Sequence, residues 1–191
     1  LKYFEKMPAV YDELLSTNPI FIARVKNVGV LSADQARSFA VTGPNLRGSG
    51  VPLDLRRSEP YSAYPDFKFD VVTRPQGDCL ARYQVRVEEM RQSAAIVAQA
   101  LDGLPEGEII SKVPRVFRPP VGEAYARVES CRGIQGFYLV SDGSAKPARC
   151  RIRVPSFANL AAMPALLAGV AVADVVAIMG SLDFIIPEID R

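Results

Sequence analysis

One apolar seam constrains this chain more than any other feature of its sequence. Between Asp78 and Gly103, apolar residues recur at alternating spacings of three and four positions, and they are Leu80, Tyr83, Val87, Met90, Ala94, Val97 and Leu101. This spacing places all of them on one side of an α-helix. Asp78 is a favourable N-cap residue, and glycine is the preferred residue just beyond the last turn. The seam therefore predicts a long core helix that starts near Asp78 and ends at Gly103.

The same predicted helix carries a second, charged face. Arg82, Arg86 and Glu89 are spaced four and three positions apart, so their side chains are neighbours on the helix surface. Two interpretations fit this pattern. The residues form either a charged face in solvent or a buried ion network against a partner, and the spacing alone favours neither.

The periodicity changes from helical to two-residue alternation after residue 120. The segments 123–130, 134–143 and 148–155 alternate polar and apolar side chains, and glycines at 133 and 143 mark turns between them. Three antiparallel strands are therefore predicted. Short helices are predicted to follow at 157–160 and 171–180.

The segment before the seam divides into a helical part and a long loop. Helical patterns up to residue 40 are interrupted at Asn18-Pro19 and restart at a capping box formed by Ser32 and Gln35. Residues 41–76 are rich in proline and glycine, and they have little periodicity. Four aromatic residues in this stretch distinguish it from a disordered chain. We therefore expect a long ordered loop that crosses a surface and docks a partner.

These elements indicate an α+β fold that is mainly helical and has a small three-stranded antiparallel sheet. We expect two regions. Residues 1–110 form the helical region with the ordered loop 41–76. Residues 111–191 form the sheet, followed by carboxyl-terminal helices and a tail.

Composition excludes several classes of function. The 191 residues carry 23 Lys plus Arg and 21 Asp plus Glu, so the net charge of +2 predicts no nucleic-acid partner. Histidine is absent, and with it the usual proton shuttle, so chemistry at this chain needs groups from another chain. Arginine outnumbers lysine by 17 to 6, which is typical of buried ion pairs and subunit interfaces.

Three weaker signals concern binding and location. The segment GPNLRGSG at 43–50 lacks the lysine of a P-loop, so we expect its glycines to serve backbone conformation under a partner subunit rather than to bind phosphate. The cysteines at 79, 131 and 150 lack metal-site spacing and are predicted to be reduced core residues. The uncharged run 154–173 is long enough to cross a membrane, but two prolines and a glycine divide it, so short buried helices are predicted.

The chain ends on DFIIPEIDR, which is unusual because terminal tails are commonly polar and frayed. Isoleucines alternate here with charged residues up to the last position. A tail of this composition is expected to pack against something or to line a site.

Several long motifs resemble one known family, the D subunit of NADH:quinone oxidoreductase, respiratory complex I. In chain order these motifs are GPNLRGSGVPLDLRRSEPYSAY, GDCLARYQVRVEEMRQS, GEAYARVES, YLVSDGSAKPARCRIRVPSFANL and ADVVAIMGSLDFIIPEIDR. The resemblance spans 21–191 and corresponds to the carboxyl-terminal half of that subunit. Because the sequence also lacks an initiator Met, we expect it to begin within a longer protein.

The resemblance implies a role for the tail. The family is related to the large subunit of [NiFe] hydrogenases, which ends in DPCxxCxxH/R, with two cysteines that bind the metals. On that motif Asp183 keeps the aspartate, Ile185 and Glu188 replace the cysteines, and Arg191 takes the final basic place. Isoleucine has no metal-binding atom, so no metal site is expected. The resemblance implies that Asp183, Ile185, Glu188 and Arg191 line a quinone pocket in the former metal cavity.

This sequence departs from the family pattern at two places. Pro187 stands where the family usually has glycine, and the segment 104–120 is shorter than in many members. The family's quinone head-group ligands, a His and a Tyr, belong to the amino-terminal half, so no catalytic residue is expected in this chain.

The resemblance also implies a function and partners. The chain would be part of the quinone-site subunit of a proton-pumping NADH:quinone oxidoreductase, beside the terminal iron-sulfur cluster of the B subunit. Its partners would be the B and C subunits, the membrane-arm subunits and quinone, with NAD(H) and the iron-sulfur clusters held by other subunits and no cofactor bound by this chain. The implied location is peripheral, on the cytoplasmic side of the inner membrane. Two alternatives stay open: a relative of the large subunit of membrane-bound [NiFe] hydrogenases, and a purely structural docking subunit.

Overall fold

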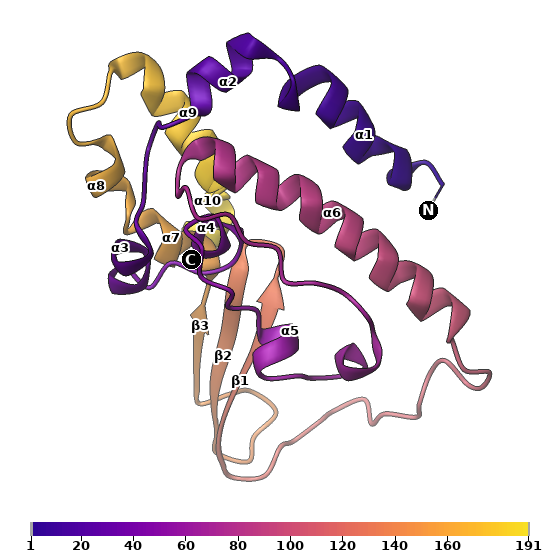
Figure 1. Cartoon of the computed structure of the whole chain (residues 1–191). Coiled ribbons are helices and arrows are strands. Elements are labelled where there is room, and N and C mark those ends of the chain that lie inside the picture. Colours follow the sequence, from indigo (N-terminus) through magenta and orange to yellow (C-terminus); the bar gives the residue numbers. More distant parts are fainter. Residues whose placement is uncertain (1, 191) are drawn as a thin grey trace.

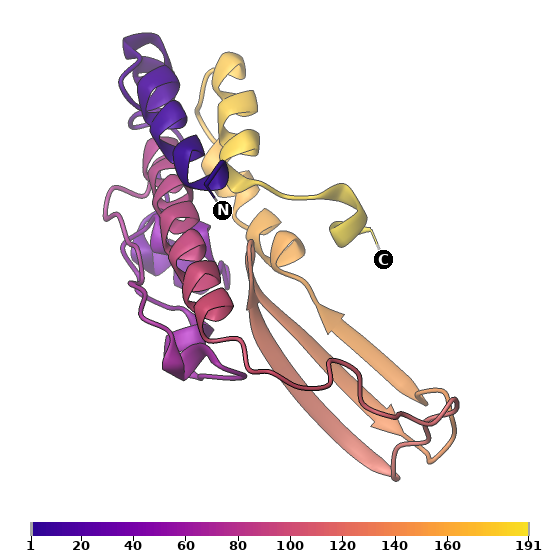
Figure 2. The ribbon, with the colours of Figure 1, turned by 90° about the vertical axis from the view of Figure 1, so that its right-hand side faces the viewer.

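The computed structural model describes residues 2–190 and consists of a helical body from which a three-stranded sheet extends (Figures 1 and 2). The α+β fold predicted from the sequence is confirmed. The helices are α1 (Met7–Tyr11), α2 (Pro19–Val25), α3 (Ala33–Ser38), α4 (Pro44–Arg47), α5 (Leu55–Ser58), α6 (Cys79–Asp102), α7 (Pro155–Leu160), α8 (Met163–Leu167), α9 (Val172–Leu182) and α10 (Ile186–Ile189). Short 3-10 turns at Phe4–Lys6 and Tyr64–Asp66 and a π-helical turn at Asp12–Ser16 complete the helical part.

The long helix α6 has the predicted bounds, but the predicted buried seam is only partly correct. The Asp78 carboxylate caps the helix by accepting a hydrogen bond from the Ala81 amide at 2.7 Å. Of the seam residues, Val87 and Ala94 are buried, whereas Val97 and Leu101 near its end are 47% and 59% exposed. The most deeply buried apolar side chain of the helix, Val85, lies beside the seam and not in it. Burial in α6 ends at Ala94, so the seam loses its cover over the last two turns of the helix.

Polar contacts show what packs against each half of α6. In the first half, Arg82 bonds to Ser181 of α9, and Glu89 bonds to Arg47 of α4. In the second half, the Gln92 and Gln99 side chains accept hydrogen bonds from backbone amides of the long loop, at Asp70 and Lys68. The loop therefore covers one side of the helix end and leaves the seam open.

The hydrophobic core gathers side chains from all parts of the helical body. Its buried members are Val25, Leu31, Ala36, Val41, Leu46, Cys79, Ala162, Leu166, Ile178 and Leu182. The guanidinium of Arg82, which is fully buried, donates to the carbonyls of Gly77 and Gly29 at 2.8 and 2.9 Å. A single side chain thus satisfies backbone acceptors that would otherwise be buried without partners.

The long segment 41–76 is ordered, as predicted, but its first part does not cross a surface. Residues 41–49 are buried beneath the rest of the chain. The Thr42 amide donates to Asn159 of α7 at 2.9 Å, and the Asn45 side chain donates to the Leu182 carbonyl at 2.9 Å. Docking of this segment to a partner stays a prediction.

The glycine-rich start of this segment has a conformational role, but under this chain's own sheet rather than under a partner. Gly43 has a φ of 68°, and a Cβ at this position would lie 2.5 Å from both the Arg132 carbonyl oxygen and the Gly133 Cα. Only glycine tolerates both the backbone conformation and this close approach. The segment therefore fixes the place where the sheet joins the body.

The sheet has the antiparallel order β1 (Gly122–Ser130), β2 (Gly133–Ser141) and β3 (Arg149–Arg153). All three predicted strands are present. The turn between β1 and β2 lies against the helical body, and the turn between β2 and β3 lies at the far end (Figure 1). The register pairs Ala126 with Phe137 and Phe137 with Ile152.

The uncharged run 154–173 forms short helices, as predicted, and supplies Ala162 and Leu166 to the core. Within residues 2–190, no helix is long and apolar enough to cross a membrane. The prediction of three core cysteines is wrong, because only Cys79 is buried. Cys131 lies in the turn between β1 and β2, and Cys150 lies on a sheet face that the body leaves open.

A buried arginine joins the sheet to the helical body. The Arg47 guanidinium is 1% exposed and donates to the carboxylates of Glu89 in α6 and Glu129 in β1, at 2.6 and 2.7 Å. The Leu55 amide donates to the second oxygen of Glu129 at 3.2 Å, and the Asp54 carboxylate lies 3.9 Å from Arg47. Burial raises the pKa of the Glu129 carboxyl, and the Arg47 charge and hydrogen bond oppose that effect.

We expect Val85→Ala to lower the free energy of unfolding by about 2 kcal/mol, because it deletes two buried carbons and leaves a cavity. The matched change Val97→Ala, on the same helix but half exposed, should change it by less than about 0.5 kcal/mol. Urea denaturation of both variants followed by circular dichroism checks this difference. Equal losses at the two positions would contradict the burial described for α6.

We expect Arg47→Met to lower the free energy of unfolding by about 3 to 5 kcal/mol, because it leaves the Glu129 carboxylate buried without its cation. The control is Arg37→Met, because Arg37 is exposed and pairs with exposed Asp34. This change should alter the free energy of unfolding by less than about 0.5 kcal/mol. Adding Glu129→Gln to Arg47→Met should recover part of the loss. A double variant as unstable as the sum of the two single variants would show that the two side chains are not coupled.

Candidate functional site

The tail begins at a residue that three parts of the chain hold in place. Asp183 caps the end of α9 with a φ of 53°, a left-handed conformation that turns the chain sharply. The Arg132 Nε donates to the Asp183 carbonyl at 2.7 Å, and its second nitrogen lies 3.4 Å from the Asp183 carboxylate. The Arg86 Nε lies 3.8 Å from the same carboxylate. Asp183 is therefore the junction of α6, the β1–β2 turn and the tail.

Arg86 faces Asp183 from the middle of α6. Its terminal nitrogens donate to the Arg82 carbonyl, the Asn45 side chain and, at 3.4 Å, the Leu182 carbonyl. Burial lowers the pKa of the Arg86 guanidinium to about 10, while the Asp183 carboxylate acts in the opposite direction. The side chain thus remains a cation at neutral pH, and Asp183 is the carboxylate that neutralises it.

Arg86 and Asp183 line a cavity with charged walls, which we call the charged cavity. Its volume is about 450 Å³. Its lining residues are Phe4, Arg47, Arg56, Tyr64, Arg86, Glu89, Met90, Ser93, Glu129, Ser130, Cys131 and Asp183. Three arginines and three carboxylates line these walls, so the formal charges of the lining side chains balance.

Arg86 also lines a second cavity. This cavity of about 480 Å³ lies between α2, α6 and α9, and most of its wall is apolar, including Phe21, Tyr83 and Val176. Arg86 therefore contributes to the walls of both the apolar cavity and the charged cavity. The sequence pattern at 82–89 left open whether its charges are solvated or buried. The buried network is correct, and its partners belong to this chain.

The other tail residues leave the charged cavity and pack on α7. The Ile185 amide donates to the Ser156 hydroxyl at 3.4 Å, and that hydroxyl donates to the Glu188 carboxylate. Ile185 is partly exposed. Asp183 therefore faces one site, while Ile185 and Glu188 lie together at another place a few residues further along the tail.

The four residues predicted to line a pocket thus have different positions. Asp183 lies on the charged cavity, Ile185 and Glu188 lie over Ser156, and Arg191 lies outside the described residues. Within residues 2–190, no three His, Cys, Asp or Glu side chains gather as a group suited to a metal ion.

Two residues of the site escaped the sequence analysis. Arg132 lies within the turn marked by Gly133, and Ser156 lies in the uncharged run, so neither belongs to a charged pattern. Their contacts to the tail span 51 and 29 positions in sequence. Pairings of this kind leave no local signal, because they depend on how the elements pack.

Comparisons with known proteins bear on what this site belongs to. A protein-family model described as "Respiratory-chain NADH dehydrogenase, 49 Kd subunit" matches residues 1–120 and 112–191. The chain is 52% identical over 181 residues to the second of the NADH-quinone oxidoreductase D subunits of Solibacter usitatus (strain Ellin6076), covering 95% of this chain and 49% of that protein.

Two further relatives give the same result. The chain is 48% identical over 192 residues to the NADH-quinone oxidoreductase D subunit of Desulforamulus reducens, covering 99% of this chain and 52% of the relative. It is 48% identical over 196 residues to the first of the NADH-quinone oxidoreductase D subunits of Anaeromyxobacter sp. (strain K), covering 100% of this chain and 52% of the relative.

The chain spans about half the length of the curated relatives it matches. Both the family model and these relatives agree with the resemblance carried by the sequence motifs, and together they cover the chain from end to end. This chain therefore belongs to the family of the 49-kDa subunit of the respiratory-chain NADH dehydrogenase, the D subunit of NADH-quinone oxidoreductase.

Proposed function

We propose that this chain is part of the quinone-site subunit of a proton-pumping NADH:quinone oxidoreductase and that its tail forms one wall of the quinone pocket. The family membership supports the enzyme, since the relatives are named NADH-quinone oxidoreductase. The position of Asp183 supports the site. It fixes the start of the tail at a charged cavity, whereas Ile185 and Ile186 beyond it leave apolar surface exposed.

A wall of this composition suits a quinone. The ring of a quinone is apolar, and its two carbonyl oxygens accept hydrogen bonds, so a fitting pocket combines apolar surface with a few fixed polar groups. The tail offers isoleucine side chains for the ring and keeps Asp183 and Glu188 in defined places through Arg132, Arg86 and Ser156. In this proposal the chain contributes binding and orientation, and electron transfer belongs to other subunits.

Other subunits surround the tail in this proposal. The terminal iron-sulfur cluster belongs to the B subunit, and the B, C and membrane-arm subunits are the neighbours. NADH is oxidised elsewhere in the complex. The chain itself holds no cofactor, and the complex lies at the cytoplasmic face of the inner membrane.

We expect Glu188→Gln and Arg191→Met, each in the assembled complex, to lower quinone reductase turnover about tenfold. Loss of one charge-assisted hydrogen bond at the pocket wall costs about 1.5 kcal/mol or more, which corresponds to that factor. Oxidation of NADH by an artificial acceptor such as ferricyanide should be unchanged, because it does not use the quinone pocket. Asp34→Asn, an exposed change on α3, is the control.

The same measurements separate the alternatives. Loss of both activities together with loss of assembly would favour a purely structural docking role. Unchanged quinone turnover in both tail variants would show that the tail is not part of the quinone pocket. Nickel found by elemental analysis of the intact complex would favour a relative of the [NiFe] hydrogenases.

We also expect the isolated chain to reduce no quinone. In this proposal the cluster and the head-group ligands lie outside the chain, so no electron path reaches its tail. The measurement is reduction of a water-soluble quinone with NADH as the donor, compared with a blank that lacks the chain. A rate that rises in proportion to the chain concentration would contradict this prediction.

A further inference from the structure

The sheet presents an apolar face to solvent. On each strand the side chains alternate between two faces, and the register brings Ala126, Phe137 and Ile152 together on one of them. We call this surface the apolar sheet face. Its members are Ala124, Ala126, Val128, Phe137, Leu139, Cys150 and Ile152, all of them exposed.

The opposite face of the sheet is polar, and it is the one that meets the body. Arg127 on this face pairs with Glu59, and Glu129 pairs with Arg47. Antiparallel sheets normally pack their apolar face on a core and leave the polar face in water. Here the arrangement is reversed. Contiguous exposed apolar surface of this kind marks an interaction site.

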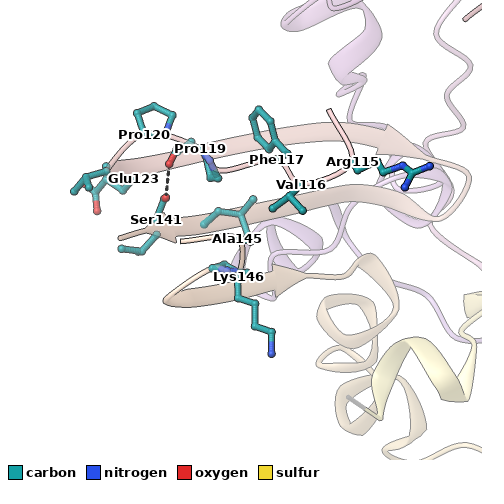
Figure 3. Close-up of a pocket in the computed structure, with 15 residues that line it drawn as sticks. Arg115, Val116, Phe117, Pro119, Pro120, Glu123, Ser141, Ala145 and Lys146 are labelled. Atoms are coloured by element: carbon teal, nitrogen blue, oxygen red, sulfur yellow. Dashed lines mark hydrogen bonds between the residues drawn. The ribbon is translucent and has the colours of Figure 1, made fainter. Parts of the chain in front are cut away.

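A concave site lies at the far end of this face. Residues 115–120 of the connection between α6 and β1 pass beside the sheet, and a cavity of about 850 Å³ separates them from it (Figure 3). Val116 and Phe117 line the connection side, and Ala124 and Leu139 line the sheet side. The Ser141 hydroxyl donates to the Pro119 carbonyl at 3.2 Å and ties the connection to the strand. A hollow between two chain segments admits one extended or helical segment, and a flat membrane cannot enter it.

The charges around this end are mainly positive, although Glu123 also lines the cavity. Residues 112–153 carry nine Lys or Arg and three Asp or Glu. Arg115 and Lys146 line the cavity, and Figure 3 shows the Lys146 side chain extending outward from its rim. Four cations of the connection and of the β2–β3 turn have no ion-pair partner among residues 2–190: Lys112, Arg115, Arg118 and Lys146. Arg149, Arg151 and Arg153 belong to the opposite, polar face of the sheet. The complementary ligand is apolar along one side and acidic along its flanks.

We propose that the apolar sheet face and this cavity dock an acidic, amphipathic segment of another polypeptide of the same complex. Its apolar side chains cover Phe137, Leu139 and Ile152, and its carboxylates pair with Arg115 and Lys146. The inference rests on the proposed function only in that the assembled complex supplies the partner. It involves neither the tail nor the quinone.

The first test uses Cys150, which lies on the apolar sheet face. In a Cys131→Ser variant, Cys150 is the one exposed thiol among residues 2–190, since Cys79 is buried. We expect N-ethylmaleimide to modify Cys150 at least tenfold more slowly in the purified assembled complex than in the isolated chain. Equal rates would overturn the proposal, because the face would then be open in the complex.

The second test identifies what covers the face. A photoreactive p-benzoylphenylalanine replaces Leu139 in the assembled complex, and mass spectrometry reads the cross-linked peptide. The expected product is a peptide from another subunit that contains more Asp and Glu than Lys and Arg. A lipid adduct, a cross-link to a second copy, a cross-link within the same chain or a basic peptide would each overturn the proposal.

Charge reversal tests the electrostatic part. Arg115→Glu with Lys146→Glu should lower the yield of that cross-link at least fivefold, while the matched control Lys6→Glu with Lys26→Glu should leave it unchanged. Thermal unfolding of the isolated variants verifies that both fold. An unchanged cross-link yield in the Arg115 and Lys146 variant would show that the partner is not bound through acidic side chains, and it would overturn the proposal. Because the readout is a cross-link, loss of quinone turnover with the cross-link intact would count against the proposed function and not against this one.

Discussion

The contact between Arg47 and Glu129 is the interaction on which the rest of this structure depends. Both side chains are almost completely buried, and such a pair is retained only when geometry and additional hydrogen bonds offset the loss of water. Arg47 meets that condition with Glu89 as its second acid and with the Leu53 carbonyl, at 2.9 Å, as a further acceptor. The contact thereby joins α4, α6 and β1, which are far apart in sequence. It also seats the β1–β2 turn on Gly43, and that turn carries Arg132, which holds the tail at Asp183.

Periodic elements of this fold could be predicted from the sequence, and their surroundings could not. The helix at 79–102, the capping box at Ser32 and the three strands each rest on contacts between residues close in sequence. The open end of the α6 seam illustrates the limit. A repeat of three and four positions says which residues share a helix face, and nothing in it says how far the opposing elements reach. The burial of residues 41–49 was missed for the same reason, because turn-forming residues are typical of exposed loops and here they are covered by the sheet and α7.

The candidate site was reached from the sequence only through the resemblance, and its geometry required the structure. The motif places Asp183, Ile185 and Glu188 in one short run, yet the left-handed backbone at Asp183 turns the chain so that they serve two places. Asp183 meets Arg86 and Arg132, while Ile185 and Glu188 share Ser156. Neither arginine could be assigned in advance, because each pairs with the tail across many positions and each has a second use: Arg86 for backbone carbonyls and Arg132 for the turn.

The Arg47–Glu129 pair also accounts for the exposed apolar face of the sheet. Successive side chains on a strand point to opposite faces, so a strand that directs Glu129 and Arg127 toward the body must direct Val128, Ala126 and Ala124 away from it. A shift of one residue in register would bury the apolar set and expose the charged one, but it would leave Arg47 without Glu129. The buried Arg47 side chain therefore selects the register that leaves the apolar side chains exposed to water. The side chains of this face cover one another across the strands, but their outer surface stays in water, and its burial is available to whatever binds there.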